Sequence, residues 1–122
     1  MTEETYDVLI VGGGPAGLTA AHYLSLAGYK ATVFEAGDQP GGMLVSGIPA
    51  YRLPRDTLQK EIAGLVDENV TLRCNQALGR DFTVDSLFAE GFKAVFLAIG
   101  AHKSKALNLE GEDVRGVFPA IE

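Results

Sequence analysis

Four short apolar runs are spaced along the chain between stretches of a different composition. Each is only five to seven residues long and rich in β-branched or aromatic residues, which is typical of strands buried on both faces of a parallel sheet. The predicted strands are Tyr6–Val11 (YDVLIV), Lys30–Glu35 (KATVFE), Val70–Cys74 and Lys93–Ile99 (KAVFLAI). Gly100 is expected to end the fourth and most apolar of them.

The stretches between the strands predict three helices. The first spans Pro15–Ala27 with Gly28 as its C-cap. The second begins near Pro54, carries an apolar stripe of Leu58, Ile62 and Leu65, and is stopped by Asn69. The third spans Val84–Glu90, with Thr83 or Asp85 near its start. The segment 37–50 contains four glycines and two prolines and is predicted to be a structured loop.

This order of elements predicts an α/β fold with one parallel sheet and helices on both of its faces. Right-handed crossovers and the adjacency of consecutive elements favour the strand order third, second, first, fourth. The order reverses between the first and fourth strands, and ligands bind beyond the carboxyl ends of strands at such a point. We expect residues 1–122 to form a single domain, because the length leaves room for no second one.

A glycine-rich turn follows the first strand directly. Gly12, Gly14 and Gly17 form G-x-G-x-x-G between a predicted strand and a predicted helix, which is the Rossmann-like context in which this motif binds a dinucleotide pyrophosphate. Glu35 ends the second strand, where a carboxylate accepts hydrogen bonds from ribose hydroxyls and repels a 2′-phosphate. The motif by itself leaves the choice between FAD and NAD open.

Composition limits the classes of partner and the cellular compartment that can be expected. The formal net charge of −6 argues against nucleic acid and gives no attraction to anionic lipid. The apolar runs are too short to span a bilayer, so no membrane partner is expected. Cys74 is the single cysteine, so neither an internal disulfide nor a metal cluster is expected. The acidic start Met-Thr-Glu-Glu lacks the basic region of a signal peptide, so the expected location is cytoplasmic.

Several longer motifs go beyond the fingerprint and resemble one family. VGGGPAGL, FEAGDQPGGML, GIPAYRLP, the GRD of Gly79–Asp81, VFLAIGA and LEGED are similar to stretches of the flavin domain of the glutamate synthase small-subunit family, and dihydropyrimidine dehydrogenase carries a similar domain. The resemblance covers residues 6–122 and implies that FAD is the bound dinucleotide. The resemblance implies that Gly12, Gly13, Gly14, Pro15 and Ala16 line the FAD pyrophosphate, and that Glu35, followed by Ala36, binds the adenosine ribose. It also implies that Gly42 and Met43 contact the FAD, that Arg52 binds its phosphate or ribityl side, that Leu78 lies near the adenine and that Gly100 lies near the phosphate crevice. Gly17 belongs to the same site through the motif, where it lets the helix pack close to the strand.

The resemblance also implies a larger oxidoreductase that passes electrons from NAD(P)H through FAD to an acceptor. In that family an iron–sulfur region precedes this domain, and a nicotinamide-binding domain and a late Gly-Asp segment follow it. We therefore expect an N-terminal fragment that is inactive alone and meets NAD(P)H only in the full-length parent or with a partner subunit. No catalytic or metal-binding residue is predicted, because neither His22 nor His102 has an acid or nucleophile at a suggestive spacing. Two alternatives stay open, a non-catalytic dinucleotide-binding module that needs a partner chain and the NAD-binding domain of a dehydrogenase.

Overall fold

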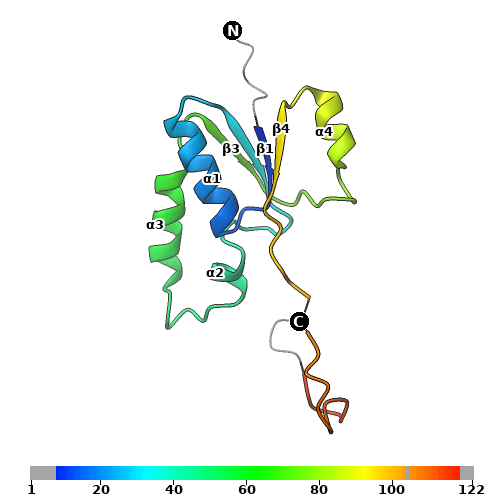
Figure 1. Ribbon diagram of the computed structural model, residues 1–122. Coiled ribbons are helices and arrows are strands. Elements are labelled where there is room, and N and C mark those ends of the chain that lie inside the picture. The colour runs from blue at the N-terminus through cyan, green and yellow to red at the C-terminus, as the bar shows by residue number, and fades with distance from the viewer. Residues whose placement is uncertain (1–7, 104, 119–122) are drawn as a thin grey trace.

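The computed structural model describes residues 8–103 and 105–118 and forms one four-stranded parallel sheet from them (Figure 1). The strands are β1 (Val8–Val11), β2 (Ala31–Phe34), β3 (Val70–Arg73) and β4 (Ala94–Leu97). Their order is β3-β2-β1-β4, which confirms the predicted topology. Val8 of β1 pairs with Ala31 of β2 and with Ala94 of β4, so the three strands start and end in step. Their carboxyl ends therefore meet at one edge of the sheet.

Helices cover the two faces of this sheet unequally. On one face, α1 (Pro15–Leu26) packs on the strands and α3 (Arg55–Leu65) packs on α1, while α4 (Val84–Glu90) lies on the opposite face (Figure 1). A fourth and much shorter helix, α2 (Met43–Ser46), lies beyond the carboxyl ends of the strands. The expected arrangement of helices on both faces is confirmed.

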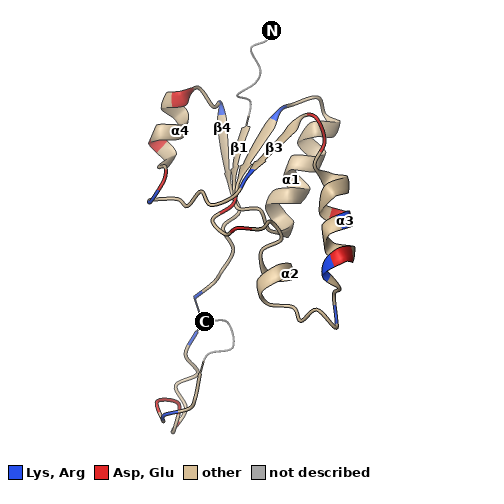
Figure 2. Ribbon diagram, turned by 180° about the vertical axis from the view of Figure 1, so that it is seen from behind, with Lys and Arg blue, Asp and Glu red and all other residues tan. Residues whose placement is uncertain are grey.

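The alternation of side chains along β1 divides the core into two layers. Leu9 and Val11 face α4, whereas Ile10 faces α1, and all three are buried. A third cluster of Leu18, Leu58 and Ile62 joins α1 to α3. α1 contains no Asp, Glu, Lys or Arg, and the charges of the described residues lie on α3, α4, the strand ends and the loops (Figure 2).

The edge strand β4 is much less covered than the strands beside it. Phe96 and Leu97 keep 44% and 56% of their surfaces exposed, although all four residues of β4 are apolar. The segment after β4 runs away from the layers and leaves further apolar side chains exposed, among them Leu107 and Phe118 (Figure 1). No helix within residues 8–103 and 105–118 has the length and apolar character needed to cross a bilayer.

The structure corrects several predicted boundaries. Tyr6 and Asp7 of the first predicted strand lie outside the described residues. β4 is shorter than its prediction by one residue at the start and two at the end. The C-cap of α1 is Ala27, not Gly28; Gly28 follows it at φ +92, and the amide of Tyr29 bonds to the carbonyl of Leu24 (2.9 Å). This bonding is the glycine-terminated end that the sequence indicated, shifted by one residue.

Two predictions about the loops are wrong. The segment 37–50 is not all loop, because Met43–Ser46 forms α2 between two glycines, too short for any periodicity to reveal. Asn69 does not stop α3, which ends four residues earlier at Leu65 because Val66 is already extended (φ −98, ψ 111). Asn69 instead belongs to a turn in which its amide donates to the carboxylate of Asp67 (2.9 Å). The third helix has the predicted bounds, and Thr83 caps it by accepting from the amide of Ser86 (3.0 Å).

Candidate functional site

The three motif glycines have different structural reasons to lack a side chain. A Cβ on Gly12 would overlap the carbonyl oxygen of Ala98, and one on Gly17 would overlap the carbonyl oxygen of Gly12. These two glycines therefore let β1, β4 and α1 pack closely. A Cβ on Gly14 would meet only the Cα of Gly42, at an ordinary 3.7 Å. Gly14 thus leaves open space in front of the backbone, as a site for an approaching ligand requires.

The amides at the start of α1 face this open space without partners. Gly14 is the N-cap residue and supplies no side-chain hydrogen bond, and Pro15 occupies the first helical position. Among the hydrogen bonds of the described residues, none uses the amide of Gly14 or Ala16. Free amides at a helix N-terminus, together with the helix dipole, favour an anionic ligand.

Glu35, directly after β2, links the glycine turn to the next loop. One carboxylate oxygen accepts the amide of Gly13 (2.9 Å) and the other accepts the amide of Gly37 (2.7 Å). An ionised carboxylate has about four acceptor positions, so each oxygen keeps capacity for a further donor. Glu35 is therefore placed to hold the turn in shape and to accept hydrogen bonds from a ligand at the same time.

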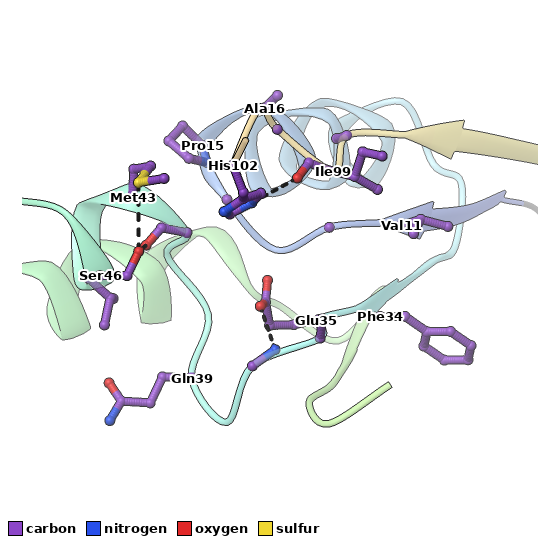
Figure 3. Close-up of a pocket in the computed structure, with 18 of the residues that line it drawn as sticks. Val11, Pro15, Ala16, Phe34, Glu35, Gln39, Met43, Ser46, Ile99 and His102 are labelled. Atoms are coloured by element: carbon purple, nitrogen blue, oxygen red, sulfur yellow. Dashed lines mark hydrogen bonds between the residues drawn. The ribbon is translucent and has the colours of Figure 1, made fainter. Parts of the chain in front are cut away.

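These elements enclose a crevice of about 540 Å³ beyond the carboxyl ends of the strands (Figure 3). Its position at the switch between β1 and β4 is the predicted one. The residues that line it are Val11, Gly12, Gly14, Pro15, Ala16, Phe34, Glu35, Ala36, Gly37, Asp38, Gln39, Gly42, Met43, Val45, Ser46, Gln76, Leu78, Ala98, Ile99, Gly100, Ala101 and His102.

The short helix α2 forms one wall and is fixed from two directions. The amide of Gly41 donates to the carbonyl of Gly13 (2.7 Å), which joins the loop before α2 to the glycine turn. The guanidinium of Arg55, at the start of α3, donates to the carbonyls of Leu44 (3.0 Å) and Val45 (2.6 Å). The motif PGGML is thus a built wall of the crevice and not a loose loop.

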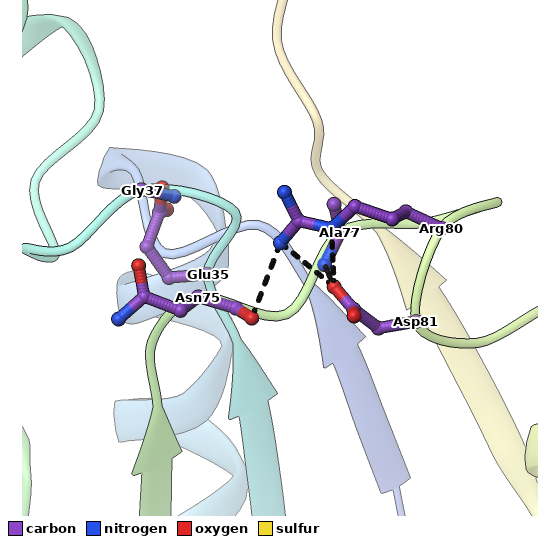
Figure 4. A network of polar contacts seen from close by, with 6 residues as sticks. All are labelled: Glu35, Gly37, Asn75, Ala77, Arg80 and Asp81. Carbon is purple, nitrogen blue, oxygen red and sulfur yellow. Dashed lines mark hydrogen bonds and ion pairs between the residues drawn. The ribbon is translucent and has the colours of Figure 1, made fainter.

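The segment after β3 forms another wall, and the GRD motif stabilises it (Figure 4). Asp81 accepts the amide of Ala77 (2.8 Å) and the Nε of Arg80 (2.9 Å), and Arg80 also donates to the carbonyl of Asn75 (3.3 Å). The hydrogen bond from Ala77, followed by that from Arg80, lowers the pKa of the Asp81 carboxyl. This compact turn holds Gln76 and Leu78 in the crevice wall.

Cys74 lies at the same end of the sheet and is half-buried. Burial, followed by the charges of Glu35 and Asp38, raises the pKa of its thiol. A thiol with a raised pKa stays protonated at neutral pH, and the thiolate is the nucleophilic form of cysteine. The cysteine therefore has the chemistry of a packing residue.

Most of the residues that the sequence proposed lie together in the crevice. Gly12, Gly14, Pro15, Ala16, Glu35, Ala36, Gly42, Met43, Leu78 and Gly100 all line it. Gly13 and Gly17 lie behind this lining, and Gly13 takes part through its bond to Glu35. Arg52 is exposed between α2 and α3, with its guanidinium carbon 6.0 Å from the ring centre of Tyr51, and does not line the crevice. The contact between Arg52 and a cofactor stays a prediction.

Sequence reasoning missed several polar members of the lining. Gln39 lies in the loop before α2, Ser46 ends α2, Gln76 follows β3, and His102 follows β4. The available signal was their position just beyond a strand end or next to a motif glycine. The residue types of Gln39, Ser46 and Gln76 carry no signal of their own, because glutamine and serine are mostly exposed in any protein.

Comparison with known proteins agrees with this geometry. A family model described as an NAD(P)-binding Rossmann-like domain matches residues 10–55, which include the glycine turn, Glu35 and α2. The fold of this chain is Rossmann-like. This Rossmann-like domain superposes on the structure of Mycobacterium tuberculosis FprA in complex with NADPH with a TM-score of 0.78, at 26% identity, covering 92% of this chain and 26% of that one.

Among curated relatives, subunit beta of the NADP(+)-dependent formate dehydrogenase of Moorella thermoacetica is 49% identical over 117 residues, which cover 94% of this chain. The small chain of the NADPH glutamate synthase of Bacillus subtilis (strain 168) is 43% identical over 115 residues, again 94% of this chain. The resemblance indicated by the sequence motifs is thereby confirmed. This chain spans 16% and 23% of the lengths of these two relatives.

Proposed function

We propose that this domain binds FAD and is the flavin-binding module of an NAD(P)H-dependent oxidoreductase. The observation that carries the proposal is the open space in front of Gly14, where a Cβ would meet only Gly42, beside the free amides at the start of α1. The residues present fit a dinucleotide there, with amides for the pyrophosphate and the Glu35 carboxylate for a ribose. FAD, when bound, supplies hydride and single-electron transfer, and the protein supplies position and environment.

The choice of FAD over NAD is supported by the wall that α2 adds. Gly42 and Met43 extend the crevice past the glycine turn, and Arg55 and Gly41 fix that extension to the domain. These residues come from PGGML and the segment after it, motifs through which the chain resembles flavin domains and which a site for NAD does not need. Leu78, 40% exposed, offers apolar surface next to the same crevice.

A second part of the proposal concerns the rest of the protein. Strands of parallel sheets are ordinarily covered on both faces, whereas Phe96, Leu97 and Ile99 in and after β4 are each about half exposed. Together with the length of the relatives, this supports further polypeptide packed against β4, either a nicotinamide-binding domain or a partner subunit. The FAD-loaded domain alone, mixed with NADPH, is therefore expected to keep the absorbance of oxidised flavin.

Binding of FAD to the wild-type chain and to Gly14→Ala tests the first part. The substitution fits the folded backbone, since Gly14 has φ −82, so the free energy of unfolding should change by no more than about 1 kcal/mol. The new methyl group fills the space for the pyrophosphate, which should weaken FAD binding by about 5- to 150-fold, corresponding to an overpacking cost of 1–3 kcal/mol. Isothermal titration calorimetry measures the affinity and urea unfolding the stability.

Gly64→Ala is the matched control, because Gly64 lies in α3 with no atom within 4 Å of its Cβ position. FAD affinity should be the same in this variant as in the wild type. Equal FAD affinity of Gly14→Ala and the wild type would remove the pyrophosphate from this crevice. Tighter binding of NAD than of FAD by the wild type would instead assign the chain as the NAD-binding domain of a dehydrogenase.

A further inference from the structure

The turn after β4 closes the crevice on the side opposite the loop of β2. The carbonyl of Ala98 packs directly against Gly12, and a Cβ on Gly12 would also lie 3.3 Å from the amide nitrogen of Ile99. Residues 98–102 therefore sit against the glycine turn, and all five line the crevice. Any group that this turn carries is presented to a ligand held by the start of α1.

His102 is folded back within this turn into a defined position. Its Nε2 lies 3.0 Å from the carbonyl oxygen of Ile99 (Figure 3). A carbonyl only accepts, so Nε2 must carry the proton and donate it. Gly100, at φ +76, allows the ring to lie close, because its Cβ position is 3.3 Å from Nε2. Within residues 8–103 and 105–118, no hydrogen bond engages the other ring nitrogen, Nδ1.

The side chains that line the crevice leave it without a positive charge, which a protonated His102 would add. The lining contains two carboxylates, Glu35 and Asp38, and none of its described residues is a lysine or an arginine. A dinucleotide pyrophosphate is anionic, so the backbone amides have to bind it against this local field. His102 is the one side chain of the lining that becomes a cation on protonation, when Nδ1 becomes a donor as well.

We propose that His102 binds a phosphate of the dinucleotide through Nδ1, with Nε2 anchored on the carbonyl of Ile99. The inference rests on the proposed function, since it places the ligand phosphates between the start of α1 and the turn after β4. It assigns His102 to binding and gives it no part in chemistry. No role for His102 was predicted, because no acid or nucleophile lies near it in the sequence. The contacts through Gly12, Ala98 and Ile99 bring it to the site.

Three substitutions of His102 separate anchoring from ligand contact. Asparagine places a polar atom near the position of Nδ1, and glutamine places one near the position of Nε2. FAD titration of the full chain should show affinity about tenfold weaker for His102→Ala, as expected for loss of one charge-assisted hydrogen bond. His102→Asn should recover part of that loss, whereas His102→Gln should not. His22 is the other histidine of the chain and lies in α1. The variant His22→Ala should bind FAD like the wild type.

The outcomes distinguish this inference from the proposed function. If the wild type binds FAD and His102→Ala binds it equally well, His102 has no contact with the ligand and the inference fails while the proposed function stands. If His102→Gln restores affinity and His102→Asn does not, the ring only shapes the turn, which also overturns the inference. If the wild type binds no FAD, the proposed function fails and the inference fails with it.

Discussion

A carboxylate that accepts two hydrogen bonds lies at each end of the sheet, but the two carboxylates have different surroundings. At the carboxyl ends of the strands, Glu35 accepts backbone amides from Gly13 and Gly37. At the amino ends, Asp67 accepts the hydroxyl of Ser25 (2.6 Å) and the amide of Asn69 (2.9 Å), and thereby ties the end of α1 to the turn before β3. Both carboxylates connect segments that are distant in sequence.

The difference lies in what surrounds each carboxylate. Ser25 is 7% exposed and also accepts a hydrogen bond from the side-chain amide of Asn69 (3.3 Å). Asp67, Ser25 and Asn69 thus form hydrogen bonds with one another. Glu35 instead lines a crevice beside free helix amides and a glycine with open space in front of it. The bonding of a carboxylate therefore does not distinguish a structural role from a binding role. What distinguishes the two roles is open space and unpaired hydrogen-bond donors next to the carboxylate.

The largest effect on stability is expected from a side chain added at Gly17, where α1 and β1 pack closely at the carboxyl end of the sheet. A Cβ in Gly17→Ala would overlap the backbone carbonyl of Gly12, which cannot move without separating α1 from β1. We expect the free energy of unfolding to fall by about 3 kcal/mol or more in urea denaturation. Gly64→Ala, with open space at its Cβ, should instead stabilise the chain by about 0.5–1 kcal/mol. Similar stability of the two variants would mean that α1 and β1 do not approach as closely as described.

A smaller effect should separate the two carboxylates directly. Glu35→Ala leaves the amides of Gly13 and Gly37 without their acceptor, so the free energy of unfolding should fall by about 1–3 kcal/mol. FAD binding should weaken by about tenfold or more, because the ribose acceptor and the shape of the glycine turn are lost together. Asp67→Ala should lower stability and leave FAD affinity unchanged. Calorimetric titration and urea unfolding of both variants make the comparison; a loss of FAD affinity in Asp67→Ala would show that the two ends are coupled.

Much of this architecture was predictable from the sequence. The strand order follows from four short apolar runs and right-handed crossovers, and the crevice follows from the glycine motif with Glu35 at the next strand end. These predictions succeed because they depend on local composition and general topology. The hydrogen bond between Glu35 and the amide of Gly13 was not predictable, since it spans 22 positions and needs the two strands to be in register.

What the sequence missed has physical reasons as well. α2 is stabilised by the Arg55 guanidinium, and arginine has no preference that marks it as a partner of carbonyls in another helix. Asn69 looked like a helix stop because asparagine favours turns, but the turn it forms belongs to the Asp67–Ser25 group. The place of His102 depends on the packing of Ala98 against Gly12, a contact between the segments that follow β4 and β1, and no local sequence pattern predicts it.

The smallest expected effect is a change in the pH dependence of stability at the amino end. The hydrogen bond from Ser25, followed by that from Asn69, lowers the pKa of the Asp67 carboxyl below its ordinary value. A carboxyl whose pKa is lower when folded contributes stability above its unfolded pKa and loses it as pH falls through the folded pKa. The stability difference between the wild type and Asp67→Asn should therefore be constant from neutral pH down to about pH 5 and should shrink below about pH 4.

Urea unfolding of both proteins across this pH range measures the difference, and Ser25→Ala is the control. Because Ser25 gives the largest contribution to the lowered pKa, the same Asp67→Asn substitution in the Ser25→Ala background should change the pH dependence less. Glu35 serves the opposite end of the sheet, so Asp67→Asn should leave FAD affinity intact at every pH tested. A stability difference that persists undiminished well below pH 4 would show that Asp67 does not act through its charge, and the likeness between the two carboxylates would then be one of position alone.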